Sequence, residues 1–323
     1  MRKNYSWLLV VLLAGCQINQ PMNQKTTSTN ADSPTVVKST RQLTTDNFEL
    51  SRYFESSQSD DALKLASSEE EEDKGDLWLR ITSQFELTVP DQEEVDYYRN
   101  WYIKHPKHLE TVAQRAKPFL HLIVEKIEER GLPLELALLP VVESSFDAHA
   151  NSYGGAAGLW QFVPSTGKRY GLTQNSWYDG RRDVAASTDA ALDYLSNLNK
   201  TFKGNWNQTI AAYNSGSGRV ANAIKQNKRQ GKPTNIFSLD LPSETSNYVP
   251  KLLALADVIK HHKEYGLNIP SIPDEPTLTL VDPNEQLDLS IAAQYAGITL
   301  KQLKRYNPGF NKSTTTSNGP QAL

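Results

Sequence analysis

Apolar residues recur at helical spacing from Asp76 to His262, and this periodicity most constrains the fold. Leu109, Val112 and Ala116, for example, follow steps of three and four that define one face of an amphipathic helix. No convincing alternation of apolar and polar residues predicts strands in this span. The pattern predicts a mainly α domain over residues 76–270. Helical spacing covers Leu109–Ala116, and a new helix is expected from Pro118 with a stop at Gly131. Further helices are expected over Pro133–Glu143, Asp183–Phe202, Trp206–Asn214 and Ser243–His262. Pro140 is expected to bend the first of these just before Glu143, and Pro250 to kink the last.

Charge and composition exclude several classes of partner. The chain of 323 residues has a formal net charge of −3 and a pI of about 6.1. It therefore lacks the basic footprint of a protein that binds nucleic acid. The 6 histidines show no metal-ligand spacing, so we expect no metal and no cofactor.

The N-terminus predicts an exported, lipid-anchored protein. Arg2 and Lys3 precede an apolar segment over residues 7–14 that is too short to span a bilayer. The following Leu13-Ala14-Gly15-Cys16 resembles the lipobox of bacterial lipoproteins, and Cys16 is the only cysteine. A plain signal peptide with an incidental cysteine is the alternative. Gln17 stands where lipoproteins retained in the inner membrane commonly carry Asp, so this resemblance favours the periplasmic side of the outer membrane.

The segment over residues 17–75 is rich in Ser, Thr, Asn, Gln and Asp and includes the acidic run 69–73. Such a composition is typical of a disordered tether. A flexible chain of about 60 residues has an r.m.s. reach on the order of 40 Å.

Three short motifs predict a groove with a single acid. Glu143 ends an apolar helix, Gly158-Leu159-Trp160-Gln161 forms a turn with an amide, and Ala212-Tyr213-Asn214 supplies a phenol and a second amide. Neutral hydrogen-bonding groups and aromatic faces around one carboxyl suit a polar, uncharged polymer such as a glycan. A phosphate-bearing ligand would call for basic residues instead.

These motifs resemble those of soluble-lytic-transglycosylase domains, relatives of goose-type lysozyme that cleave bacterial peptidoglycan. The match extends from about Asp76 to about Tyr265. The resemblance implies a lysozyme-like (goose-type) catalytic domain. It also implies that Glu143 protonates the glycosidic oxygen between MurNAc and GlcNAc, then takes the proton of the muramyl C6 hydroxyl, and so leaves a 1,6-anhydro end.

The apolar neighbours of Glu143 in sequence predict a raised pKa, because desolvation disfavours the charged carboxylate. The alternative is an ordinary surface Glu at a helix end. Glycoside hydrolysis generally needs a second carboxylate, and Asp147, Asp179 and Asp183 all resemble turn, cap or ion-pair residues. This favours a mechanism with one carboxylate.

The family resemblance also implies substrate-binding residues, each with a structural alternative. Ser152 is expected to bind the acetamido or C6 region or to be a loop serine, and Gln161 to bind the glycan or to cap a helix. Tyr213 is expected to bind Glu143 or the acetamido group or to be a buried structural tyrosine. The remaining candidates are Asn214 as a secondary contact, and Glu244 and Tyr248 as residues that close the groove.

After Pro270 the pattern changes to a small α+β unit. Residues 277–281 predict a strand, and Leu289–Tyr295 and Leu300–Tyr306 predict two short helices. With Asn307-Pro308-Gly309 they resemble a LysM glycan-binding module, although Pro283-Asn284-Glu285-Gln286 replaces the usual opening. We expect a degenerate or truncated LysM-like segment over residues 275–323.

The sequence favours the first of three functions, and intact Glu143, Gln161 and Tyr213 argue against the third. The first is a lytic transglycosylase acting on peptidoglycan glycan strands and anchored in the membrane through Cys16. The second is a hydrolytic muramidase on the same fold, and the third is a peptidoglycan-binding lipoprotein that no longer catalyses. Protein partners are not predicted.

Overall fold

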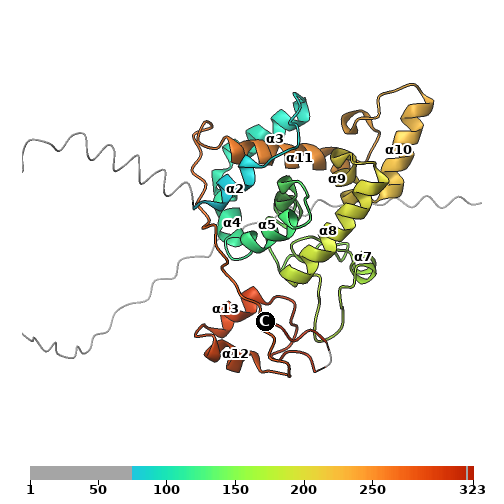
Figure 1. Ribbon diagram of the computed structural model, residues 1–323. Coiled ribbons are helices and arrows are strands. Elements are labelled where there is room, and N and C mark those ends of the chain that lie inside the picture. Colours follow the sequence, from blue (N-terminus) through green and yellow to red (C-terminus); the bar gives the residue numbers. More distant parts are fainter. Residues whose placement is uncertain (1–74, 318) are drawn as a thin grey trace, which may run out of the picture. The chain divides into compact units, whose positions relative to one another are not determined.

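The computed structural model describes residues 75–317 and 319–323, and all the secondary-structure elements in this part are helices (Figure 1). The expected signal peptide, Cys16 and the tether lie outside the described residues. The helices up to and including the one that carries Glu143 are α2 (Leu77–Ser83), α3 (Glu93–Lys104), α4 (Pro106–Ala116), α5 (Leu120–Glu128), η1 (Leu134–Leu138) and α6 (Leu139–Ser144). Those after it are α7 (Pro164–Arg169), α8 (Val184–Thr201), α9 (Trp206–Ser215), α10 (Ser217–Arg229), η2 (Ile236–Ser238), α11 (Ser243–Lys260), α12 (Leu289–Tyr295) and α13 (Leu300–Tyr306).

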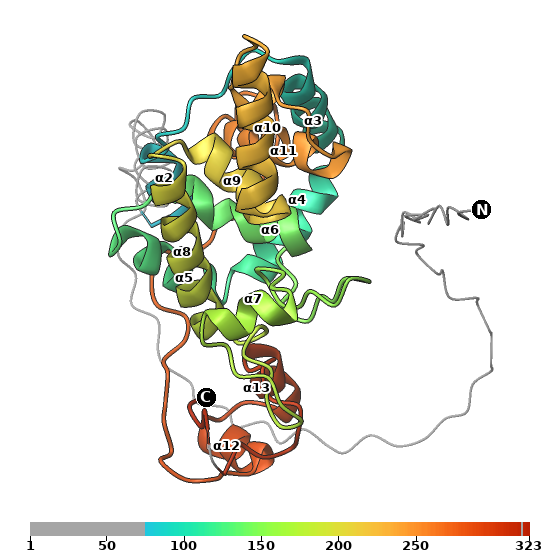
Figure 2. The same ribbon diagram turned by 90° about the vertical axis from the view of Figure 1, so that its right-hand side faces the viewer.

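Helix α11 is the centre of the larger core. It packs against α3, α9, α2, η1 and α6, and Figures 1 and 2 both show it beside α3 and α9. Because neighbouring helices surround α11, its buried residues lie on several sides of the helix and not on one face. They extend from Thr245 to Ile259. Pro250 lies inside the helix, as the sequence indicated.

Side-chain caps explain where several helices begin. Asp76 accepts a hydrogen bond from the Trp78 N–H at 3.0 Å, and Asp183 accepts one from the Ala186 N–H at 2.7 Å. A short polar side chain at this position satisfies a backbone donor that has no partner within the helix. Asp183 thus caps the start of α8, which confirms the cap among the roles considered for it from sequence.

The segment that leads to Glu143 differs from its prediction. The expected single helix from Pro133, bent at Pro140, is a 3₁₀ turn (η1) followed by a separate short α-helix (α6). Pro140 lies in the first turn of α6, where the missing N–H costs nothing. The proline therefore begins the helix that carries the acid and does not bend one already formed.

The α6 helix stops abruptly after Ser144, the residue that follows Glu143. Ser145 and Phe146 both have positive φ, at 50° and 60°, and their N–H groups donate to the carbonyls of Val141 and Pro140. A left-handed conformation is uncommon for a bulky residue such as Phe and has an energetic cost. Phe146 is only 2% exposed, so burial of its ring in the core offsets that cost.

The C-terminal segment forms a small core of its own. Leu289, Ala292, Ala293 and Leu303 are buried together, apart from the main cluster. Helices α12 and α13 begin and end where the sequence predicted them. The predicted strand over residues 277–281 is wrong, because these residues form no strand and only Val281 exchanges a pair of backbone hydrogen bonds, with Leu323.

The turn at Gly158 packs so closely that only glycine fits. Its φ is +82°, and a Cβ there would lie 1.9 Å from the carbonyl oxygen of Arg181. Gly171 has the same φ of +82°, but no atom lies within 4 Å of the place that a Cβ would take on this residue. The two glycines therefore separate the cost of the backbone conformation from the cost of the close contact.

We predict that Gly158→Ala lowers the free energy of unfolding by more than about 4 kcal/mol, because strain and a backbone collision add. Gly171→Ala is the matched control and should cost only about 1–2 kcal/mol for its left-handed φ. Urea unfolding followed by tryptophan fluorescence measures both values. Equal losses in the two variants would contradict the close packing at Gly158.

Candidate active site

Glu143 lies at the end of α6, partly covered by the core helices. Burial raises its pKa from the ordinary value of 4.5 to about 7. The hydroxyl of Tyr248 donates a hydrogen bond to Oε1 of Glu143, which acts in the opposite direction, while the charge of Glu244 raises the pKa further. A carboxyl group with these properties is largely protonated below neutral pH and titrates close to it.

Tyr248 is the direct partner of the acid. It is 4% exposed and comes from the second turn of α11, far from Glu143 in sequence. Burial and the nearby Glu143 raise its own pKa well above the ordinary value. The phenol therefore remains a hydrogen-bond donor to the carboxyl group at all working pH values.

Tyr213 contacts a backbone carbonyl and not Glu143, which fits its structural alternative. Its hydroxyl donates to the backbone carbonyl of Trp160 at 2.8 Å, and burial together with the charge of Glu143 raises its pKa well above the ordinary value. The contact links α9 to the turn that precedes Gln161. The charge of Glu143 thus acts on Tyr213, while the Tyr213 hydroxyl proton is donated to the Trp160 carbonyl.

The turn from Gly158 to Gln161 is fastened to the acid-bearing helix. The hydroxyl of Ser144 donates to the Leu159 carbonyl at 3.0 Å. Trp160 is fully buried and donates from Nε1 to the Thr188 hydroxyl at 2.9 Å, so it belongs to the core. Gln161 has a positive φ of 47°, and its Nε2 donates to the Gly158 carbonyl at 2.8 Å. This hydrogen bond uses the amide nitrogen of Gln161 and not its amide oxygen.

The remaining candidates lie in two places. Ser152 is exposed in the loop after α6, where its hydroxyl oxygen accepts from the Ala156 N–H at 3.0 Å. Asn214 accepts from the Thr245 hydroxyl at 2.8 Å and donates to Glu244 at 3.4 Å. Asn214, Glu244 and Tyr248 thus lie together around the start of α11, whereas Ser152 lies in a separate loop.

The three carboxylates considered as a second acid have other partners. Asp179 forms a two-bond ion pair with Arg181, at 2.9 and 2.7 Å. Asp147 accepts from the His149 N–H at 2.9 Å, and Asp183 caps α8 and accepts from the Tyr178 hydroxyl at 2.6 Å. Glu244, which the sequence interpretation did not treat as a second acid, is the carboxylate whose charge acts on Glu143.

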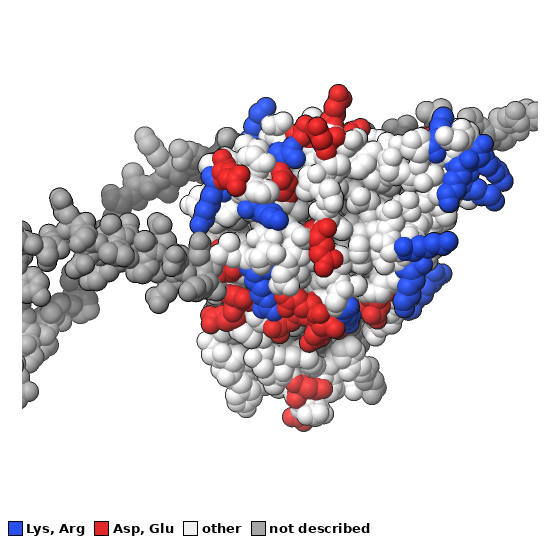
Figure 3. Space-filling view, turned by 45° about the horizontal axis from the view of Figure 1, so that its top comes forward, with Lys and Arg blue, Asp and Glu red and all other residues white. Residues whose placement is uncertain are grey.

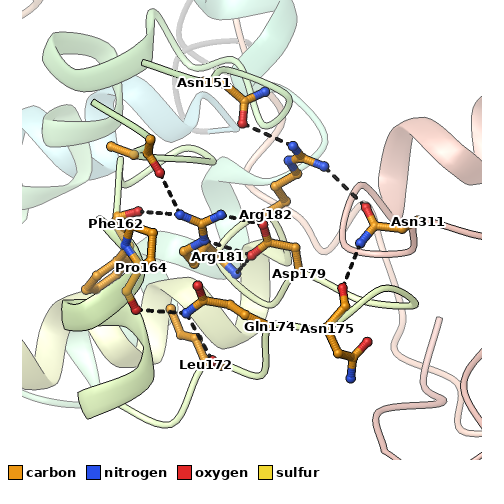
Figure 4. Close-up of polar contacts among 12 residues, drawn as sticks. Asn151, Phe162, Pro164, Leu172, Gln174, Asn175, Asp179, Arg181, Arg182 and Asn311 are labelled. Carbon is orange, nitrogen blue, oxygen red and sulfur yellow. Dashed lines mark hydrogen bonds and ion pairs between the residues drawn. The ribbon is translucent and has the colours of Figure 1, made fainter. Parts of the chain in front are cut away.

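The sequence analysis did not predict a role at the site for two arginines, Arg181 and Arg182. Arg181 donates to the carbonyls of Gly155 at 2.7 Å and Phe162 at 3.3 Å, and Arg182 donates to the Asn151 side chain at 3.0 Å. Both therefore support the loop that carries Ser152 and Gln161 (Figure 4). The only sequence signal was their position between a turn and a helix cap.

Neither a membrane-spanning helix nor a metal cluster is present in the described part. Between residues 75 and 323, position 318 apart, no helix is both long and apolar enough to cross a bilayer. Over the same residues, the His, Cys, Asp and Glu side chains form no group of three or more that could hold a metal ion.

The described residues form a mainly helical domain with one buried acid, followed by a smaller module with its own core. Residues 122–236 match the family described as Transglycosylase SLT domain, and residues 277–323 match Lytic transglycosylase MltD, LysM-like domain. The chain belongs to the transglycosylase SLT family.

Several proteins of known name are similar to the chain. Membrane-bound lytic murein transglycosylase D of Escherichia coli strain K12 is 45% identical over 247 residues, which are 76% of this chain and 55% of the relative. The chain thus spans about half the length of that relative. A putative tributyltin chloride resistance protein of Alteromonas sp. strain M-1 is 41% identical over 169 residues, 52% of this chain and 80% of the relative. The X-ray structure of an inactive mutant of the lytic transglycosylase Slt from Pseudomonas aeruginosa is 26% identical, covers 46% of this chain and 24% of that chain, and has a TM-score of 0.36.

The raised pKa of Glu143 has a consequence for stability. In the folded protein the group keeps its proton up to about pH 7, whereas in the unfolded chain it loses the proton near its ordinary value of 4.5. The stability that this proton contributes is therefore present below the lower value and is lost as the pH rises through the higher one.

We predict that Glu143→Gln, which carries no titrating group, becomes more stable relative to the unchanged protein as the pH rises from 5 to 8. The gain should be about 1–3 kcal/mol, since partial exposure screens some of the charge. Urea unfolding at the two pH values measures it. A difference between the two proteins that does not change with pH would show that the pKa of Glu143 is not raised.

Proposed function

We propose that the chain is a peptidoglycan lytic transglycosylase in which Glu143 acts first as acid and then as base. The observation that carries the proposal is the burial of Glu143, which raises its pKa to about 7 and keeps it partly protonated at neutral pH. The membership of the SLT family and the similarity to a lytic murein transglycosylase over 76% of the chain support the same reaction.

The hydrogen bond from Tyr248 fixes which oxygen carries the proton. In the protonated acid, Oε1 accepts from the phenol, so the proton is carried by Oε2. Oε2 donates it to the oxygen between MurNAc and GlcNAc, and the C1–O bond breaks. The carboxylate then takes the proton of the muramyl C6 hydroxyl, whose oxygen bonds to C1 and closes the 1,6-anhydro ring. The acid is regenerated without consuming water.

The neighbours of Glu143 have supporting roles in this proposal. Gln161 offers an amide oxygen, Tyr213 a hydroxyl that can still accept a hydrogen bond, and Ser152 an exposed hydroxyl to the sugars. Asn214 is proposed as a secondary contact, and Glu244, to which it donates a hydrogen bond, as a residue that closes the groove. The substrate's own N-acetyl oxygen stabilises the positive charge at C1, so no second protein carboxylate is needed.

The protein is further proposed to be held at the periplasmic side of the outer membrane by acylation of Cys16. Several acyl chains on one cysteine anchor a protein stably where one chain does not. The match to a membrane-bound relative supports an envelope location. The LysM-like module would add contacts to the glycan strands.

Muropeptide mass spectrometry of purified peptidoglycan digested with the full chain tests the reaction. We expect 1,6-anhydro-muramyl ends from the unchanged protein, and a loss of at least about a hundredfold in rate from Glu143→Gln, because proton transfer is removed. Glu129→Gln changes an exposed Glu after α5 and serves as the control that keeps activity.

Products heavier by one water would instead identify a muramidase, and Glu244 would then be the carboxylate to replace next. If no product forms while the protein still sediments with peptidoglycan, the chain is a binding lipoprotein and the proposed reaction is wrong.

A further inference from the structure

A hollow in the molecule lies between the loops of the catalytic domain and the LysM-like module. It has a volume of about 430 Å³. His149 and Arg182 line it from one side, and seven residues of α13 and the following loop line it from the other. We call it the module pocket. The seven module residues are Lys304, Asn307, Pro308, Phe310, Asn311, Lys312 and Ser313.

Backbone hydrogen bonds join the catalytic domain to the module beside the module pocket. The Asp179 N–H donates to the Gly309 carbonyl at 2.8 Å, and the Asn311 N–H donates to the Trp177 carbonyl at 2.7 Å. The ring of Tyr178 packs against Phe310, with ring centroids 5.2 Å apart. A Cβ on Gly309 would lie 2.8 Å from this tyrosine ring, so the close approach depends on glycine. The catalytic domain and the module are therefore in direct contact beside the pocket, whose lining residues His149, Lys304 and Lys312 are exposed.

The lining of the module pocket carries positive charge without a carboxylate. Arg182, Lys304 and Lys312 are cationic, and none of the other lining residues is acidic. Arg182 binds only the neutral side-chain oxygens of Asn151 and Asn311, at 3.0 and 3.4 Å. Its Nε is buried and has no hydrogen-bond partner among the described residues. The nearest carboxylates lie outside the lining: Asp179, which is paired with Arg181, feels the charge of Arg182, and Asp288 feels that of Lys304. A lining with three cations and no carboxylate favours an anionic ligand.

The module pocket also adjoins the loop of the proposed glycan groove. Figure 4 shows Arg182 extending between Asn151 and Asn311, and Arg181 between Asp179 and the Phe162 carbonyl. Asn151 immediately precedes Ser152, and His149 lies in the same loop. A polymer whose glycan lies in the groove would therefore pass its side groups close to this pocket.

We propose that the module pocket binds the carboxylates of the peptide side chains carried by the glycan strand. This inference rests on the proposed function, because it takes peptidoglycan as the substrate. Peptidoglycan combines a neutral sugar chain with peptides that bear free carboxylates, and Arg and Lys bind carboxylates through charge-assisted hydrogen bonds. The catalytic domain and the module would thus recognise the strand jointly, with the sugars in one site and the peptide in the other.

The test measures binding and not cleavage. The full chain carrying Glu143→Gln is titrated with glycan strands that bear peptides, and with the same strands after an amidase has removed the peptides. Lys304→Gln with Lys312→Gln, both at exposed positions, should weaken binding of peptide-bearing strands about 10-fold and leave that of peptide-free strands unchanged. Arg182→Gln should act in the same direction.

A matched control removes the same charge elsewhere. Helix α10 carries Lys225 and Lys228 at exposed positions, and Figure 3 shows Lys and Arg gathered at the edge of the molecule where α10 lies. Lys225→Gln with Lys228→Gln should leave both affinities unchanged. An equal loss in this control would show that charge acts non-specifically, and an equal loss for both kinds of strand would assign the pocket to the sugars. Either outcome, or no change in the module variant, would overturn the inference.

Failure of the proposed function would have a separate signature. A protein that binds peptide-bearing strands through the module pocket but yields no anhydro ends refutes the reaction and keeps the pocket. A protein that yields anhydro ends but shows no dependence on Lys304 and Lys312 keeps the reaction and refutes the pocket.

Discussion

The burial of one carboxyl group at the end of α6 is the constraint on which the site depends. Burial raises the pKa of Glu143 to about 7, while the hydrogen bond from Tyr248 limits the rise. A fully solvated carboxyl would be ionised at neutral pH and unable to donate a proton. A carboxyl buried without a donor would hold its proton too firmly to return as a base. The pairing of Glu143 with Tyr248 sets the group between these two limits.

Placing Glu143 at this helix end has an energetic cost, because the backbone is strained at three positions nearby. The packing of the surrounding structure offsets that cost. Ser145, Phe146 and Gln161 all have positive φ, although none is glycine. Conformations of this kind persist only when the packing around them fixes them. Here the Ser144 hydroxyl ties α6 to the Leu159 carbonyl, and Arg181 ties the loop on both sides of that turn. Its neighbour Arg182 then connects the groove loop to the LysM-like module.

Local sequence signals predicted the elements whose stability is local. The helices α12 and α13, the cap at Asp183 and the acid at the end of an apolar helix all follow from spacing and residue type. Contacts between distant segments could not be predicted in the same way. Nothing near Tyr248 specifies that its hydroxyl meets Glu143, and nothing near Arg182 specifies Asn311. The strand expected at 277–281 failed because its β-branched and apolar residues find no partner strand except at Val281. Ser152, Gln161 and the other proposed sugar contacts remain predictions.

The titration of Glu143 itself tests the account most directly. Carboxyl ¹³C NMR of the full chain labelled at glutamate, with Glu143→Gln to assign the signal, gives its pKa. The account predicts a value of about 7. It further predicts that Tyr248→Phe moves the value upward, because the carboxylate loses its hydrogen-bond donor. A midpoint near the ordinary 4.5 for Glu143 in the unchanged protein would contradict the central claim that burial holds this acid protonated at the site.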